Sequence, residues 1–323
     1  MLPGIRMGAA LLVAAGALTA HPLSAQEPNG TELTGLEAEV GVLDHLRVRF
    51  SGADRFTSTA DFGAFETSSH QPGGRLRIDV PVASDALLRL VANGHALLYD
   101  VDGSTSAFLP GDRFGDFYAW NITLRGAYLV DESITLFSED ERWGMLIQGG
   151  AAAAWEDGSD MDDGVRGMGS FAVGYRLGER LELIAGVSVR SRLAGGGVSI
   201  RPLVEFDWQI NQAWRLRSLG LGLQLERILN DDLTVFARVR LEGSSYRLAD
   251  RGGEVGKGIF RSRQLPAGLG IRWRISPSWR VRLMAGAVAY HQLRIKDDDR
   301  DTVESETASS PQAFVSLRVD FRP

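Results

Sequence analysis

Apolar residues recur at every second position along most of the chain, and this two-residue period is typical of β-strands. The clearest example is the range Trp279–Ile295, where Val281 and Leu283 alternate with Arg280 and Arg282. One face of such a strand meets an apolar medium and the other meets a polar one. The sequence therefore predicts an all-β protein whose strands are apolar on one side.

The alternation divides into segments that are separated by turns. In chain order they are Leu36–Phe50, Leu76–Val82, Leu88–Leu98, Tyr118–Tyr128, Trp143–Trp155, Val165–Leu177, Leu181–Leu193, Pro202–Ile210, Trp214–Ser218, Leu219–Ile228, Leu233–Leu241, Leu265–Ile275, Trp279–Ile295 and Gln312–Phe321. A soluble sandwich also alternates, but rarely through so many consecutive hairpins. We expect an antiparallel up-and-down transmembrane β-barrel of about 14 strands, or about 12 if the brief pair around Ser218 is not two spans.

The connections between these segments fall into two sizes. Short ones are Ser84–Asp85, Gly178–Arg180, Asn211–Gln212, Asn230–Asp232 and Ser276–Ser278. Long polar ones are Gly52–Gly74, Asp102–Gly115, Asp157–Gly164, Asp250–Gly258 and Lys296–Pro311. The two sizes nearly alternate, with Asp131–Glu141 as a longer linker on the short side. In outer-membrane barrels the short turns face the periplasm and the long loops face outside.

Tryptophan residues gather at the predicted strand ends: Trp143, Trp155, Trp208, Trp214, Trp273 and Trp279. Tryptophan prefers the headgroup level of a bilayer, because one end of its ring is apolar and the other is polar. Packing in a soluble β core is the alternative explanation. The mean hydropathy of only −0.08 does not exclude a membrane protein, since alternating strands dilute the hydrophobic signal.

The first 25 residues have the organisation of a secretory signal. Arg6 precedes an apolar run from Met7 to Ala20, and Leu23-Ser24-Ala25 supplies the small residues of a cleavage site. The run is shorter than the roughly 20 residues of a spanning helix. We expect a signal peptide at residues 1–25 and a barrel at residues 26–323. The chain has no cysteine, which excludes disulfides, lipoprotein anchoring and thiolate metal sites.

The segment Gln312–Phe321 ends its alternation on an aromatic residue and resembles the assembly signal of bacterial outer-membrane barrels. Leu317, Val319 and Phe321 form its apolar edge, and Arg322 and Pro323 lie beyond the alternation. On this pattern, and on the turn segments at Trp214 and Trp279, the chain resembles the uncharacterised outer-membrane barrels grouped as a domain of unknown function. The resemblance implies a bacterial outer-membrane location after cleavage, with the lipid bilayer, outer-membrane lipid and the barrel-insertion machinery as partners. It supplies no catalytic residue.

Charged residues occupy the face that should point into the lumen. The candidate lumen-lining residues are Arg47, Arg49, Arg75, Arg77, Arg125, Arg190, Arg238, Arg240, Arg272, Arg274, Arg280, Arg282, Arg318, Glu205, Asp207 and Glu242. Arginine dominates this face although the chain carries a net charge of −6. Basic rings in a narrow channel favour anions, whereas arginines that bridge to acids would plug the lumen. Both interpretations stay open at this point.

Other chemistry has little support in the sequence. Two acidic stretches, Asp157–Asp163 and Asp297–Glu306, lack the ligand spacing of an EF-hand and are expected to be solvated loops. No histidine pair has metal-ligand spacing. His291 is a formal candidate for an outer-membrane hydrolase, but no G-x-S-x-G motif accompanies it. We therefore expect no catalytic residue, no metal and no cofactor, and the acidic net charge argues against nucleic acid as a partner.

These observations favour an outer-membrane β-barrel that is a passive channel or uptake barrel for small solutes, including anions. A plugged barrel with a structural or surface-interaction role is the second hypothesis, and a hydrolase is the third. The solute is not specified by any motif.

Overall fold

The computed structural model describes residues 47–62, 66–83, 86–102, 115–129, 141–178, 180–193, 197–250, 257–297 and 301–323. Its strands are β1 (Arg47–Asp61), β2 (Glu66–His70), β3 (Gly73–Ala83), β4 (Ala86–Asp102), β5 (Phe117–Leu129), β6 (Glu141–Glu156), β7 (Val165–Leu177), β8 (Leu181–Ser191), β9 (Val198–Gln209), β10 (Trp214–Ser218), β11 (Gly222–Ile228), β12 (Leu233–Arg240), β13 (Glu242–Arg247), β14 (Ile259–Arg274), β15 (Trp279–Lys296), β16 (Thr302–Thr307) and β17 (Gln312–Phe321). A short 3-10 helix, η2 (Met161–Gly164), precedes β7. No helix within these ranges is long and apolar enough to cross a membrane.

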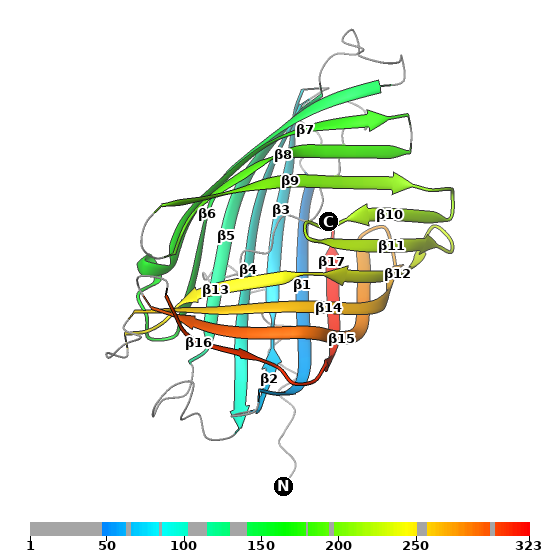
Figure 1. The fold of residues 1–323 in the computed structure, drawn as a ribbon. Coiled ribbons are helices and arrows are strands. Elements are labelled where there is room, and N and C mark those ends of the chain that lie inside the picture. Colours follow the sequence, from blue (N-terminus) through cyan, green and yellow to red (C-terminus); the bar gives the residue numbers. More distant parts are fainter. Residues whose placement is uncertain are drawn as a thin grey trace.

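The strands form one closed antiparallel barrel (Figure 1). Each strand pairs with its neighbours in the sequence, and β17 closes the circle by pairing with β1 from Phe50↔Phe321 to Thr57↔Phe314. Three strand positions of the barrel are each built from two consecutive segments, which share a pairing partner. These are β2 with β3, β12 with β13, and β16 with β17. The barrel therefore has 14 strands, as predicted.

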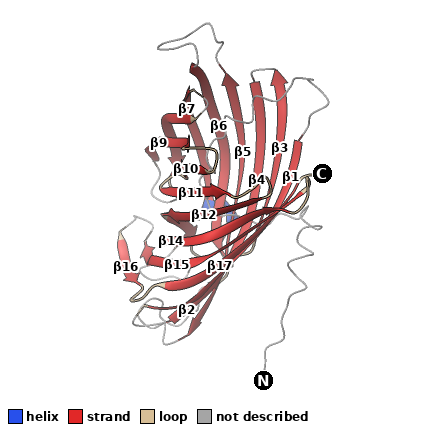
Figure 2. Ribbon diagram, turned by 90° about the vertical axis from the view of Figure 1, so that its right-hand side faces the viewer, coloured by secondary structure: helices blue, strands red, loops and turns tan. Residues whose placement is uncertain are grey.

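Hairpin β10–β11 decides the strand count in favour of 14 rather than 12. A tight turn after Ser218 connects the two strands, with the Leu219 N–H donating to the Gly222 carbonyl at 2.9 Å. Gly220 has a φ of 60°, a left-handed conformation that glycine adopts without a steric cost. The apolar alternation of Leu219–Ile228 is shifted by one residue from that of Trp214–Ser218, and this turn accounts for the shift. Both strands are short, and Figure 2 shows β3–β6 reaching much farther along the barrel than they do.

Two predicted loops are partly strand, and these expectations were wrong. Residues 51–61 continue β1 instead of opening a loop at Gly52, and β2 also falls within the predicted loop Gly52–Gly74. Thr302–Thr307 forms β16 within the predicted loop Lys296–Pro311. Large apolar residues are sparse in these segments, where Phe56 and Val303 stand among polar neighbours, so the apolar alternation is missing, but pairing with β17 and β15 still makes them strands. The predicted range 36–46 and the linkers 103–114 and 131–140 lie outside the described residues.

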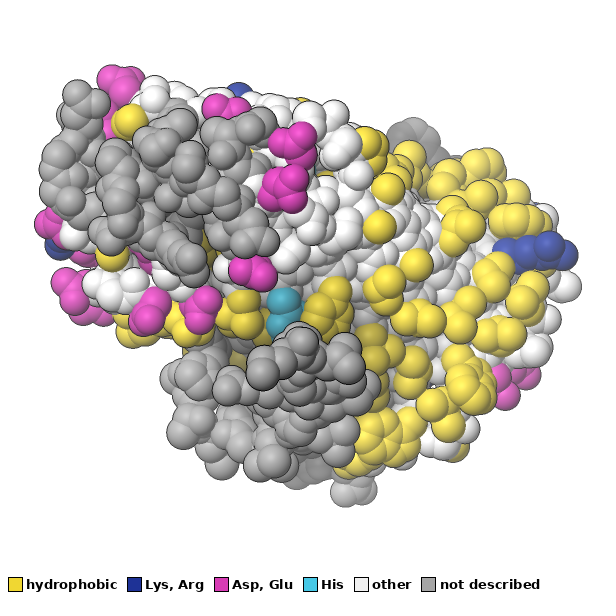
Figure 3. All heavy atoms as spheres, turned by 90° about the horizontal axis from the view of Figure 1, so that it is seen from below, with side chains coloured by type: hydrophobic (Ala, Val, Ile, Leu, Met, Phe, Trp, Pro, Cys, Tyr) yellow, Lys and Arg dark blue, Asp and Glu magenta, His cyan; other side chains and the backbone are white. Residues whose placement is uncertain are grey.

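The outer surface carries the apolar side chains of the alternation. Ile200, Val204 and Leu269 are about 70 % exposed, which is expected where lipid replaces water. In Figure 3, hydrophobic side chains cover the face from its middle to one end, whereas acidic side chains gather at the opposite end. The six tryptophans lie at or near strand ends as predicted: Trp143, Trp208, Trp214, Trp273 and Trp279 at the short-turn end, and Trp155 at the opposite end of β6.

A packed apolar cluster fills the interior at the long-loop end. The rings of Phe117 on β5 and Phe260 on β14 stack with centroids 4.7 Å apart, and Tyr246 on β13 lies 4.9 Å from Phe117. Beyond it, Arg247 pairs in parallel register with Trp155 on β6, and the Ala249 N–H donates to Glu156 Oε2 at 3.0 Å. Opposite walls therefore touch here, because β13 bends across the barrel to β6.

Candidate functional site

A cavity of about 630 Å³ lies in the middle of the barrel, next to the apolar cluster. One of its walls comes from β1, β3 and β4, and its other walls come from β7–β9 and β13–β14. The basic side chains that line it are Arg55, Arg75, Arg166, Arg190, Arg192, Arg201, Arg240, Arg261, Arg263, Lys296 and Arg318. Asp54 and Glu242 are the carboxylates among the lining residues. The cavity is therefore strongly basic.

Several of these arginines carry guanidinium nitrogens that have no hydrogen-bond partner among the residues that the structure describes. Arg240 is only 4 % exposed, and within the described part of the chain its Nε and Nη1 have no hydrogen-bond partner. The buried Nε atoms of Arg75 and Arg166 are in the same situation. Buried polar groups are normally hydrogen-bonded, and guanidinium groups bind carboxylate and phosphate through paired N–H donors. These nitrogens are themselves occluded, so they become donors for an anion in the cavity when the side chains turn toward it.

Glu242 is the acid that balances part of this charge. Its Oε2 accepts from Arg55 Nη1 at 2.8 Å across the barrel, and its Oε1 lies 3.5 Å from Arg238 Nη2. Arg55 comes from β1 and Glu242 from β13, so the pair connects two walls that are far apart in the sequence. A partly buried pair of this kind fixes the position of both strands more than it adds to stability.

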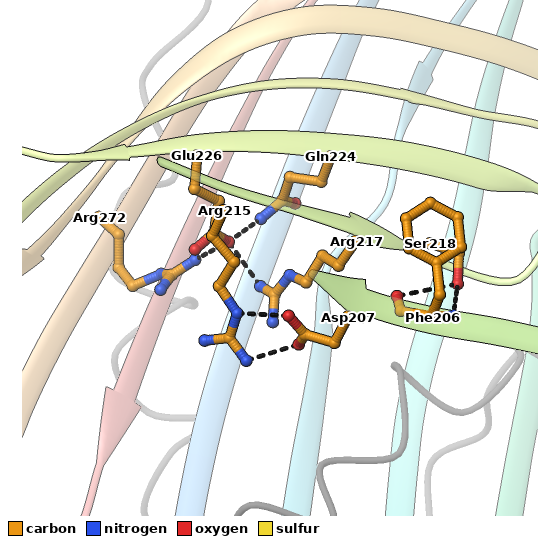
Figure 4. Close-up of polar contacts among 8 residues, drawn as sticks. All are labelled: Phe206, Asp207, Arg215, Arg217, Ser218, Gln224, Glu226 and Arg272. Atoms are coloured by element: carbon orange, nitrogen blue, oxygen red, sulfur yellow. Dashed lines mark hydrogen bonds and ion pairs between the residues drawn. The ribbon is translucent and has the colours of Figure 1, made fainter. Parts of the chain in front are cut away.

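A dense network of ion pairs fills the barrel toward the short turns. Figure 4 shows its centre, where Arg215 pairs with Asp207 through contacts of 2.5 and 2.6 Å. Arg217 and Arg272 both contact Glu226, at 2.7 and 2.5 Å. Gln224 also donates to this carboxylate. Asp207 is thus held by an arginine from β10, and Glu226 by arginines from β10 and β14, as expected for an interior in which charge must be paired.

Two further pairs extend the network around the barrel. Asp79 accepts from Arg77 and Arg89, each at 2.6 Å. Asp320 on β17 accepts from Arg318 at 3.0 Å and from the Ser51 hydroxyl on β1 at 2.5 Å. Ser51 and Asp320 lie at the seam where β1 and β17 meet, so their hydrogen bond joins the two strands that close the barrel.

The predicted lumen residues lie in several different surroundings. Arg75, Arg190, Arg240, Arg318 and Glu242 line the cavity. Arg77, Arg238, Arg272 and Asp207 belong to the ion pairs, and Arg125 donates to Gln148 at 2.8 Å and adjoins Glu205 in a small second cavity of about 50 Å³. Arg282 lies over the ring of Phe236. Arg49 and Arg280 are register partners of Arg77 and Asp320, while Arg47 and Arg274 are exposed at the short-turn end.

Sequence reasoning missed important cavity residues. Arg55 lies in the range expected to be a loop, where the alternation assigns no inward face. Arg261 and Arg263 precede the predicted strand Leu265–Ile275, yet β14 begins at Ile259. They lie on the opposite face of β14 from Phe260 and Ser262, and they line the cavity together with Ser262. The polar alternation Arg261-Ser262-Arg263-Gln264 was the available signal.

His291 has a serine partner that the sequence does not reveal. Its Nε2 lies 3.1 Å from Ser262 Oγ and 3.1 Å from Gln264 Nε2, and its Nδ1 lies 3.0 Å from Gln312 Nε2. The ring also meets Phe62 edge-on with centroids 5.3 Å apart. Both His291 and Ser262 are 3 % exposed. The arrangement joins β14, β15 and β17 within the wall, where it satisfies three buried polar side chains.

The acidic loops show ordinary charge pairing. Asp163 in η2 accepts from Lys257 Nζ at 2.9 Å, and this contact lowers the pKa of Asp163 and raises the pKa of Lys257 from their ordinary values. Among the residues that the structure describes, no group of three or more histidine, aspartate or glutamate side chains is arranged to hold a metal ion.

A closed antiparallel barrel with an apolar outer band, a polar interior and tryptophans beside its short turns is an outer-membrane β-barrel, and its location is the bacterial outer membrane. Within this class, residues 140–320 match the family described as Domain of unknown function (DUF6268), and the chain belongs to that family. A comparison with curated protein sequences finds no match.

Solved structures with a similar fold are outer-membrane barrels. An outer-membrane channel from Pseudomonas putida F1 is 11 % identical, with 91 % of this chain and 100 % of that chain covered and a TM-score of 0.43. The translocator domain of the autotransporter NalP from Neisseria meningitidis is 12 % identical, with coverage of 90 % and 91 % and a TM-score of 0.37. A Pseudomonas aeruginosa FadL homologue is 12 % identical, with coverage of 85 % and 89 % and a TM-score of 0.36. Likenesses this distant carry no argument about function.

Proposed function

We propose that the protein is an uptake barrel for small anionic solutes and that the arginine-lined cavity is its binding station. The observation that carries this proposal is the buried Arg240 side chain, which lines the cavity and has two guanidinium nitrogens without a hydrogen-bond partner among the described residues. Leaving buried donors unpaired is costly, so such donors suit a site whose partner is a ligand. Because arginines outnumber carboxylates in the cavity lining, we expect this ligand to carry a negative charge.

We infer that the barrel is closed at rest rather than a permanently open pore. The stack of Phe117 and Phe260 fills the long-loop end, and the network around Glu226 occupies the interior toward the short turns. Solute passage therefore requires these side chains to move. This favours an uptake barrel, with slow and solute-dependent transport, over a passive channel with a permanently open lumen.

Proteoliposome swelling with solutes of matched size tests the proposal. Gluconate, glucose and glucosamine share a six-carbon skeleton and differ in charge, so they separate charge selection from size. We expect gluconate to permeate fastest and glucosamine slowest, and we expect the Arg240→Gln variant to reduce the difference. Equal rates for the three solutes in the wild type, or faster glucosamine, would refute anion selection.

A structural role is the second candidate function, and the packed interior favours it. In a barrel that serves only as a scaffold or surface protein, the aromatic cluster and the ion-pair network are a permanent plug. Such a barrel would give no solute-dependent swelling above that of protein-free liposomes. The same experiment therefore distinguishes the two candidates.

A further inference from the structure

The wall of the barrel is incomplete beside hairpin β10–β11. Along β9, the pairing with β10 consists of Asp207↔Arg217, Trp208↔Leu216 and Gln209↔Arg215, and the Ser218 hydroxyl then accepts from the Phe206 N–H at 2.7 Å. On the other side, the Leu241 N–H donates to the Leu221 carbonyl at 3.0 Å. Beyond the tip of the hairpin, the segment Val198–Glu205 of β9 lies on one side of the opening and β13 lies on the other.

These two edges diverge instead of meeting. β13 bends across the barrel and pairs with β14 and, at Arg247, with β6, whereas β9 pairs with β8 up to Val198. Figure 1 shows the hairpin between β9 and β12 on one side and, among the described residues, no strand between β9 and β13 on the other. The opening follows about eight residues of β9, which is roughly 25 Å of strand.

The arginine-lined cavity reaches this opening. Ser199 and Arg201 on β9, Leu221 in the hairpin turn and Ser245 on β13 all line it. The cavity therefore extends from the wall formed by β1, β3 and β4 to the edges of the opening. It is a side portal into a basic chamber.

The hairpin tip lies at the depth of the bilayer interior. Trp214 marks the short-turn interface, and Leu219 follows five residues later, about 17 Å along the strand and about 13 Å higher at a tilt of about 40°. The apolar band of such barrels is about 25 Å tall, so the tip is near its middle. The turn Leu219-Gly220-Leu221 is apolar, unlike the polar short turns at Asn211, Asn230 and Ser276. Leu221 is 64 % exposed, and an exposed leucine turn suits lipid rather than water.

The outward-facing side chains of β9 also indicate that the opening lies at the depth of the bilayer interior. Ile200 is 71 % exposed and Val204 is 69 % exposed, and they alternate with the cavity-lining Ser199 and Arg201. One strand thus presents apolar side chains to the bilayer and polar ones to the cavity at the same height. A molecule at the portal would have its hydrocarbon part in the bilayer and its polar part among arginines.

We propose that this portal admits a single-chain anionic amphiphile from the bilayer, with its carboxylate or phosphate headgroup bound by Arg240 and Arg166 and its acyl chain passing Leu221 and Leu241. This inference rests on the uptake function proposed above and names the class of ligand for the same cavity. Lateral access also explains why the cavity can be reached although the aromatic cluster closes the long-loop end. Leu241 lines the cavity beside Arg240, so apolar and basic groups adjoin at its mouth.

The test uses the full protein in nanodiscs of phosphatidylcholine and a fluorescent long-chain carboxylate, 11-(dansylamino)undecanoic acid. We expect saturable binding that Arg240→Gln or Arg166→Gln weakens about tenfold, since each variant removes charge-assisted hydrogen bonds. Arg280→Gln is the matched control, because Arg280 is a partly buried arginine at the short-turn end that does not line the cavity. Equal binding of the corresponding alcohol, or no loss in either cavity variant, would overturn the assignment.

Competition and depth measurements complete the test. Hexanoate and inorganic phosphate should displace the probe only weakly; displacement as strong as that by dodecanoate would mean that the cavity takes free small anions, which supports the uptake function but refutes lateral access. In a Leu221→Trp variant, the added fluorescence should be quenched by phosphatidylcholine brominated on its acyl chains and not by aqueous iodide. The reverse result would place the portal in water and overturn the inference even if a cavity variant failed to fold.

Discussion

Arg55 on β1 and Glu242 on β13 form an ion pair of 2.8 Å that spans the interior of the barrel. The two side chains are 17 % and 19 % exposed, so water screens the pair only in part. We expect Arg55→Ala to leave Glu242 without its closest partner and to lower the free energy of unfolding by on the order of 3 kcal/mol. Urea unfolding in lipid vesicles, followed by heat-modifiable gel migration, measures the change.

A double-mutant cycle separates this pair from packing effects. The Arg55→Ala, Glu242→Ala variant should be more stable than the sum of the two single effects predicts, because neither charge is then left unpaired. Strict additivity would mean that the two side chains do not interact in the folded protein.

The aromatic cluster should act as the closure of the long-loop end. Replacing both Phe117 and Phe260 by alanine removes the stacked rings between β5 and β14. We expect larger conductance in planar bilayers and a loss of stability of several kcal/mol, because buried phenylalanine-to-alanine changes cost about 3–5 kcal/mol each. Phe50→Ala, on an exposed ring of β1, is the control. Unchanged conductance in a folded double variant would show that these rings do not block the path.

Phe321 should contribute more to closure than its position near the chain end suggests. Its ring packs on Trp279 with centroids 4.7 Å apart, and its backbone is in register with Phe50. Deleting Phe321–Pro323 should therefore slow insertion into vesicles strongly. Deleting only Arg322 and Pro323 should have a smaller but measurable effect, because the Arg322 N–H donates to the Ser278 carbonyl at 2.9 Å. Equal insertion of both truncated chains would exclude Phe321 as a closing residue.

The Asp163–Lys257 pair joins two loops, and its pH dependence follows from the two pKa shifts. The pair's contribution is present above the ordinary aspartate pKa of 3.8 and is lost as the pH falls through the lowered value; it is also present below 10.5 and lost as the pH rises through the raised lysine pKa. NMR of reductively methylated protein can follow Lys257, because the chain has only one other lysine, Lys296. Asp163→Asn should shift the Lys257 titration to lower pH, and an unchanged titration would show that the contact does not form in solution.

The alternation of the sequence predicted the barrel well because a two-residue period is a local property. In β15, the alternation of Val281 and Leu283 with Arg280 and Arg282 was enough to predict a strand with one apolar face. The change of phase near Ser218 located hairpin β10–β11. The polar ends of β1 and β14 were missed because strand pairing, rather than apolar alternation, holds them in the sheet.

The candidate site was only partly predictable, because it depends on a bend rather than on a pattern. The phase of each strand placed Arg75, Arg240 and Arg318 on the inner face. No local signal shows that β13 crosses to β6, so neither the position of Arg261 nor the opening beside β9 could be derived from the sequence. The same holds for Ser262 and His291, which become neighbours only when β14 and β15 pair.

The reversal potential is the measurement that tests the central claim most directly, namely that the arginine-lined interior selects anions. It is best recorded across a potassium chloride gradient on the Phe117→Ala, Phe260→Ala variant, whose path should be open. We predict a reversal potential whose sign shows that chloride permeates better than potassium. The potential should move toward zero when Arg75 and Arg240 are also replaced by glutamine. A potential on the potassium side, or one that these two replacements leave unchanged, would contradict the account.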